Sequence, residues 1–229
     1  MKSDLQYENL NKLLVNVLDL GEKIKKIINK TIEALGNLDV NLSREINLFE
    51  CEINKIEHEI ENACIKILSL YHPLASDFRK VTGYLKFITD MERISDQCTD
   101  VCEIIISGSI DTNFFLDKIL EMFKEVSGMF ERVLNIIKNP NETEANEICI
   151  FDDKIDSLFS GIVHKICCVI SDNKLNDTNK SAKNEISLEV RAAVDLLFVA
   201  KYIERIGDHC TNIAEWVIYV EKGFHPNLN

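Results

Sequence analysis

The stretch Met91-Glu-Arg-Ile-Ser-Asp-Gln-Cys-Thr-Asp-Val-Cys-Glu103 recurs 112 residues later as Ile203-Glu-Arg-Ile-Gly-Asp-His-Cys-Thr-Asn-Ile-Ala-Glu215. Seven of the thirteen positions are identical, and the same shift aligns Asp77-Phe-Arg79 with Glu189-Val-Arg191. Residues 1–112 and 113–229 also carry the same charge, 13 basic and 19 acidic residues each. Self-similarity at a fixed spacing indicates two copies of one structural unit. We therefore expect two domains, one covering residues 1–108 and the other residues 109–229.

Outside this stretch, apolar residues recur at helical spacing almost everywhere. The pattern predicts six long helices, near residues 5–34, 38–70, 74–107, 113–138, 142–171 and 185–222. Helix-ending signals stand between them, namely His72-Pro73, Ser107-Gly108-Ser109, Asn139-Pro140 and a polar loop over residues 171–184. No segment alternates as a strand would. The sequence thus predicts an all-α fold of two tandem, pseudo-symmetric, antiparallel three-helix bundles.

Composition excludes several classes of protein. The 229 residues include 38 acidic and 26 basic ones, a formal charge of −12, which argues against direct binding to nucleic acid. Only three prolines and eight glycines argue against sandwiches, barrels and dinucleotide-binding folds. No apolar run reaches the roughly 18 residues of a membrane span, and the start Met1-Lys2-Ser3-Asp4 does not resemble a secretion signal. We expect a soluble, cytoplasmic protein.

The eight cysteines follow the same interpretation. None forms a Cys-x-x-Cys motif, and Cys64, Cys149, Cys167 and Cys168 stand within apolar helical patterns. A chain of this length does not depend on disulfides for stability. We expect most of the cysteines to be reduced core residues.

Carboxylates recur at equivalent places in the two copies. The third helix of each copy carries a Glu-x-x-x-Asp pair, and the second helix carries a partner pair four residues apart. The pairs are Glu92/Asp96 with Glu50/Asn54 in copy one, and Glu204/Asp208 with Asp152/Asp156 in copy two. Residues four apart lie on one face of a helix, where two like charges repel each other.

A helical wheel places these pairs beside the apolar stripe, displaced in the same rotational sense on both helices of a copy. In one of the two possible bundle hands, antiparallel neighbours would turn the two acidic stripes toward one shared groove. Oxygen ligands of this kind suit a hard cation such as Mg, Mn or Fe. In copy one the neutral Asn54 is a weaker ligand, but Asp100 adds a carboxylate one turn further on. The competing interpretation is a solvated acidic face whose charges are balanced by Arg93 and Arg205.

Other candidate sites are weaker. His209 follows Asp208, but its repeat partner is Gln97, so we expect His209 at the surface or supporting a site. The Glu-x-x-His motif of ferritin-like di-iron proteins is absent, and no nucleophile–base set or Walker motif occurs. Nothing in the sequence supports an enzymatic activity, and no catalytic residue is predicted.

The duplicated Glu-Arg-Ile-x-Asp-x-x-Thr signature, with Pro73-Leu-Ala-Ser-Asp-Phe-Arg79 ahead of its first copy, resembles the PhoU family. The resemblance covers essentially the whole chain and implies two three-helix bundles side by side. It also implies a negative regulator of phosphate uptake and of the phosphate-starvation response. The implied partners are the ATP-binding subunit of the phosphate ABC transporter and a sensor histidine kinase, with membrane association only through those partners. We further expect a homodimer.

Some members of this family bind multinuclear iron or zinc clusters through such acidic pairs. The resemblance therefore implies Fe or Zn, with Mn or Mg as alternatives, at the pairs named above. Two other functions stay open on the sequence alone. One is a metal-dependent helical-bundle enzyme or metal store, and the other is an accessory protein of another phosphate transporter.

Overall fold

Six helices make up the computed structural model, which describes residues 2–108, 110, 116–176 and 188–226. They are α1 (Lys2–Asn37), α2 (Val40–Tyr71), α3 (Ala75–Ser107), α4 (Leu116–Lys138), α5 (Glu142–Asn176) and α6 (Leu188–Lys222). The described residues contain no strand, and the predicted all-α fold is confirmed. The predicted starts of the fourth and sixth helices, at residues 113 and 185, lie outside the described residues.

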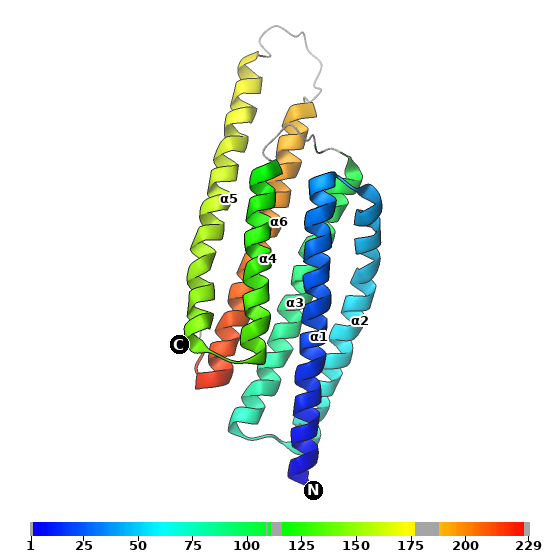
Figure 1. Cartoon of the computed structure of the whole chain (residues 1–229), viewed down its shortest axis with the longest axis vertical. Coiled ribbons are helices and arrows are strands. Elements are labelled where there is room, and N and C mark those ends of the chain that lie inside the picture. The colour runs from blue at the N-terminus through cyan, green and yellow to red at the C-terminus, as the bar shows by residue number, and fades with distance from the viewer. Residues whose placement is uncertain (1, 109, 111–115, 177–187, 227–229) are drawn as a thin grey trace.

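The helices alternate in direction along the long axis of the molecule (Figure 1). α1, α2 and α3 pack against one another, and so do α4, α5 and α6. The two groups meet where α3 packs on α6 and α1 packs on α4. Of these two contacts between the groups, the one between α3 and α6 is the more extensive. The division into domains at residues 108 and 109 stays a prediction.

Local chemistry accounts for where helices begin and end. The Asp39 carboxylate caps α2 by accepting hydrogen bonds from the backbone N–H groups of Asn41 and Leu42, at 2.9 and 3.0 Å. His72, in the left-handed conformation at φ 47°, ends α2 just before Pro73. Gly108, at φ 68°, ends α3 in the conformation that glycine adopts without strain.

The helix bounds differ from the predicted ones by up to three residues in α1 and α2, and by more at the end of α5. α5 continues to Asn176, five residues beyond the expected end at residue 171. The segment after Ser171 is polar, but it contains neither glycine nor proline, so nothing in its backbone chemistry forces the helix to stop there.

α3 and α6 approach each other closely. A Cβ atom added at Gly83 of α3 would lie 2.3 Å from Cγ2 of Val220 on α6. Around this contact runs one continuous apolar core that spans both groups of helices, with Phe87, Phe123 and Phe130 among its largest fully buried side chains. The close packing therefore depends on the absence of a side chain at residue 83.

The cysteine prediction is partly wrong. Cys64 is buried and Cys149 half-buried, as expected, but Cys167 and Cys168 are exposed. The buried stripe of α5 runs through Ile162 and Ile166. Cys167 and Cys168 follow Ile166 by one and two positions, so they are rotated from it by about 100° and 200° around the helix. The prediction that these two thiols lie in the core is therefore wrong.

Replacing Gly83 with alanine tests the close approach of α3 and α6. Alanine favours a helix interior by about 1 kcal/mol over glycine. Overpacking against Val220 costs about 1–3 kcal/mol. We expect Gly83→Ala to lower the free energy of unfolding by about 1 kcal/mol, measured by urea denaturation.

Gly128→Ala is the matched control, because Gly128 lies within α4 and a Cβ there meets nothing within 4 Å. This variant should be stabilised by about 0.5–1 kcal/mol. Equal stabilisation of both variants would show that α3 and α6 have room for a side chain at residue 83.

Candidate carboxylate metal sites

Of the four carboxylates predicted in copy two, three act electrostatically on the fourth, Asp152. The four are called cluster two here: Asp152 and Asp156 on α5, and Glu204 and Asp208 on α6. Burial, followed by the charges of Asp208, Asp156 and Glu204, raises the pKa of Asp152 to about 6. Each of the other three carboxylates thus acts on Asp152, as expected for acidic stripes on neighbouring helices.

A glycine lets the α5 carboxylate approach the α6 backbone. A Cβ atom at Gly207 would lie 2.9 Å from Oδ1 of Asp152. That oxygen is buried and has no hydrogen-bond partner in the structure. Copy one has Ser95 at the position equivalent to Gly207. Cluster two therefore holds a buried, unsatisfied carboxylate oxygen directly against the helix that carries its partners.

Copy one shows a similar gathering. Cluster one consists of Glu50 and Asn54 on α2 with Glu92, Asp96 and Asp100 on α3. Burial is the first cause that raises the pKa of Glu92, of Asp96 and of Asp100, and Glu50 adds to the rise in each case. Oδ1 of Asn54 is buried without a hydrogen-bond partner. The α2 and α3 residues therefore come together as predicted.

Arginines influence cluster one without neutralising it. Arg93 forms an ion pair with Asp90 at 3.7 Å, and its charge lowers the pKa of Glu92. The charge of Arg205 lowers the pKa of Asp100. The net shift of the pKa is upward for both Glu92 and Asp100, so burial and neighbouring carboxylates outweigh the arginine at each of them. For cluster one, the interpretation of a fully balanced acidic face is therefore not favoured.

The clusters are not assembled for a metal ion in this arrangement. Among the described residues, no three His, Cys, Asp or Glu side chains are close enough together to hold one. Glu204 instead forms an ion pair with Lys201, one turn earlier on α6. The unpartnered oxygens of Asn54 and Asp152 and the raised carboxylate pKa values nevertheless suit a hard cation. Metal binding by the two clusters stays a prediction.

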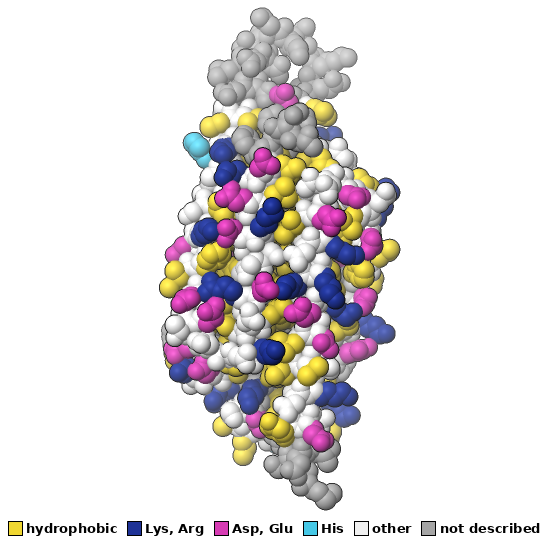
Figure 2. Space-filling view, in the orientation of Figure 1, with side chains coloured by type: hydrophobic (Ala, Val, Ile, Leu, Met, Phe, Trp, Pro, Cys, Tyr) yellow, Lys and Arg dark blue, Asp and Glu magenta, His cyan; other side chains and the backbone are white. Residues whose placement is uncertain are grey.

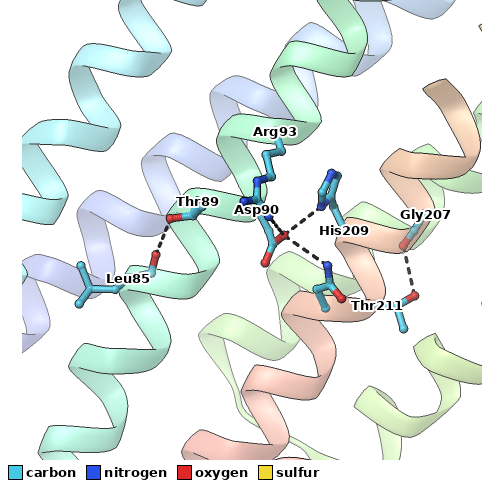
Figure 3. Close-up of polar contacts among 8 residues, drawn as sticks. Leu85, Thr89, Asp90, Arg93, Gly207, His209 and Thr211 are labelled. Atoms are coloured by element: carbon cyan, nitrogen blue, oxygen red, sulfur yellow. Dashed lines mark hydrogen bonds and ion pairs between the residues drawn. The ribbon is translucent and has the colours of Figure 1, made fainter. Parts of the chain in front are cut away.

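A polar contact between α3 and α6 was missed by the sequence analysis. Nδ1 of His209 donates to Oδ1 of Asp90 at 2.9 Å, and Nδ2 of Asn212 lies 3.4 Å from the same oxygen. Figure 3 shows His209 on α6 directed toward Asp90 on α3, with Arg93 beside it. Asp90 and His209 are both buried. His209 was expected at the surface or supporting a site, and it lies instead at the contact between the two groups of helices.

The repeat itself contained a signal for this pair. Asp90 corresponds to Tyr202 in the second copy, and His209 corresponds to Gln97 in the first. Both positions depart from the repeat, and both departures are needed for one hydrogen bond between α3 and α6.

The fold and these clusters define the class: a duplicated, all-α helical protein with one carboxylate cluster in each repeat. The PhoU domain model matches residues 17–105 and again residues 119–217. The chain therefore belongs to the PhoU family. It is 30% identical over 224 residues to the phosphate-specific transport system accessory protein PhoU homolog of Clostridium acetobutylicum, covering 96% of both chains. It is 27% identical over 215 residues to the accessory protein PhoU of Escherichia coli, covering 93% of this chain and 84% of that one.

Solved structures show the same fold. The phosphate transport system regulatory protein PhoU from Streptococcus pneumoniae superposes with a TM-score of 0.85 at 22% identity, over 97% of this chain and 100% of that chain. PhoU from Pseudomonas aeruginosa gives a TM-score of 0.84 at 23% identity, over 95% and 99%. In the part of the chain that the structure describes, no helix combines the length and apolarity needed to cross a bilayer.

The raised pKa of Asp152 predicts a pH-dependent cost in stability. A carboxylate with a pKa of about 6 keeps its proton in the folded state at pH values where the unfolded chain has lost it. This contribution to the free energy of unfolding therefore falls as the pH rises from about 4 to about 6. With metal removed by a chelator, the free energy of unfolding of Asp152→Asn should be about 1 kcal/mol higher than that of the wild type at pH 7.5. This figure is reduced because the carboxylate is partly exposed to solvent. At pH 4 the variant should be no more stable than the wild type.

Asp153→Asn is the control for this measurement, because Asp153 is the exposed neighbour of Asp152 on α5. Urea unfolding at the two pH values should show no pH-dependent difference between this variant and the wild type. A similar gain for both variants at pH 7.5 would reflect general charge reduction and contradict the role assigned to cluster two.

Proposed function

We propose that this protein is a negative regulator of phosphate uptake and of phosphate-starvation signalling. In this proposal it acts in the cytoplasm, as a homodimer, as an adaptor between the ATP-binding subunit of the phosphate ABC transporter and a sensor histidine kinase. The observation that carries the proposal is the match of the PhoU domain model to both halves of the chain. Relatives that it covers nearly end to end are named accessory proteins of the phosphate-specific transport system.

An adaptor role agrees with the surface of the molecule. Figure 2 shows lysine and arginine side chains interspersed with acidic ones on the face in view, which includes α1 and α4. Several form ion pairs between helices, such as Lys25 of α1 with Glu131 of α4 at 2.5 Å. A mixed surface with a net negative charge does not favour DNA, so regulation would pass through protein partners.

The carboxylate clusters add a metal to the proposal. Asp152, Asp156, Glu204 and Asp208 would hold a cation in cluster two, and the residues of cluster one would hold a second. A bound Fe, Zn, Mn or Mg ion would supply positive charge that offsets the carboxylate repulsion recorded in the pKa of Asp152. A cation in cluster two would hold α5 and α6 together, and a cation in cluster one would hold α2 and α3 together.

Deleting the gene tests the regulatory function. In phosphate-rich medium the deletion strain should express a phosphate-starvation reporter that the parent strain represses, because the adaptor that keeps the kinase inactive is absent. Complementation with the wild-type gene should restore repression, and additional deletion of the kinase gene should also silence the reporter. Unchanged reporter output in the first strain would contradict the regulatory proposal.

Calorimetric titration with Mn²⁺, Fe²⁺ or Zn²⁺ tests the metal proposal separately. Cluster one has the neutral Asn54 where cluster two has Asp156, and its fourth carboxylate, Asp100, stands one turn further along α3, so cluster two should bind more tightly. The double variant Asp156→Asn/Asp208→Asn should lose the tighter binding event and keep the weaker one. Asp117→Asn, an exposed change on α4, should retain both. Identical titrations of the double variant and the wild type would contradict the metal proposal and favour a solvated acidic face.

A further inference from the structure

Three potential soft ligands occupy one exposed part of α5. His164, Cys167 and Cys168 are separated by three and four residues, the spacings at which helix side chains become neighbours. All three are exposed, and none belongs to the buried stripe that includes Ile162 and Ile166. Asp156 lies eight residues earlier, about 12 Å along the helix axis. This group is therefore separate from cluster two, both in position and in ligand chemistry.

Two of the three side chains are already close to a chelating arrangement. Sγ of Cys168 lies 3.9 Å from Nε2 of His164. A tetrahedral zinc ion, with bonds of about 2.3 Å to sulfur and about 2.0 Å to nitrogen, places these two ligand atoms about 3.5 Å apart. The free pair is thus within about 0.4 Å of the bound separation, a difference that a small side-chain rotation removes.

Cys167 supplies a third ligand from the same helix. Positions three and four residues after His164 lie on either side of it, about 60° and 40° around the helix. The described residues contain no assembled group of three metal-binding side chains, so the Cys167 thiol has to turn toward the metal when it binds. Both thiols are exposed, so this rotation displaces no core side chain.

We propose that His164, Cys167 and Cys168 form a binding site for Zn²⁺ on the outer face of α5. Each thiol releases its proton to the buffer as its sulfur–zinc bond forms, and His164 binds through Nε2. Water occupies the fourth position of the tetrahedron. Thiolate and imidazole ligands select this borderline-soft cation, whereas the all-oxygen clusters suit harder ones.

Cadmium provides a probe that separates this site from the carboxylate clusters. Cd²⁺ takes the same ligands as Zn²⁺ and produces an ultraviolet thiolate-to-metal charge-transfer band, which carboxylates do not. Titration of the reduced full-length protein should produce this band at one equivalent, and Zn²⁺ should compete it away. The double variant Cys167→Ser/Cys168→Ser should lose the band, and His164→Ala should weaken binding about ten-fold or more.

Cys51→Ser is the matched control, because Cys51 is an exposed thiol on α2. It should keep the band in full, and so should Asp156→Asn/Asp208→Asn. Thermal unfolding without metal checks that every variant is folded. No band in the folded wild type, or a band that survives in the Cys167/Cys168 double variant, would overturn the proposal. Neither outcome affects the regulatory function, which the reporter strains test independently.

Discussion

The packing of α3 against α6 is the constraint on which the rest of the structure depends. These two helices form the more extensive of the two contacts between the repeats. They approach so closely at Gly83 and Val220 that an added methyl group at residue 83 would overlap the Val220 side chain. A polar group that is buried where the two helices pack needs a hydrogen-bond partner. The buried pair of Asp90 and His209 meets this requirement, with one residue supplied by each repeat.

Because α3 and α6 are surrounded by other helices, successive residues on them face different surroundings. In the second repeat Asp208 belongs to cluster two, His209 contacts the opposite repeat, and Cys210 is buried in the core. The equivalent residues of the first repeat follow the same order: Asp96 in cluster one, the buried Gln97, and Cys98 in the core. A rotation of about 100° per residue explains this succession. Asp96 and Asp208 therefore lie one step around the helix from the buried Gln97 and His209.

Much of the fold could be predicted from the sequence because it depends on local patterns. Apolar spacing identified six helices, and His72-Pro73 and Gly108 marked two of the boundaries. The helical wheel also brought the α5 and α6 carboxylates together. The pair of Asp90 and His209 was not predictable in this way, since periodicity within a helix does not specify which residues meet across two repeats. The exposed Cys167 and Cys168 were misplaced because cysteine was counted as apolar, although Ile162 and Ile166 already complete the buried stripe.

The two repeats also serve as controls for each other, since they share one architecture but differ in a few residues. Cluster one has Asn54 and Ser95 where cluster two has Asp156 and Gly207. Because residue 207 has no side chain, the buried oxygen of Asp152 lies close to the α6 backbone. Burial and the neighbouring carboxylates raise the pKa of Asp152 to about 6. Electrostatic repulsion in cluster two therefore acts on the contact between two helices as well as on the side chains. A change of charge there, whether by protonation or by a bound cation, bears directly on how closely α5 packs against the helix that joins the two repeats.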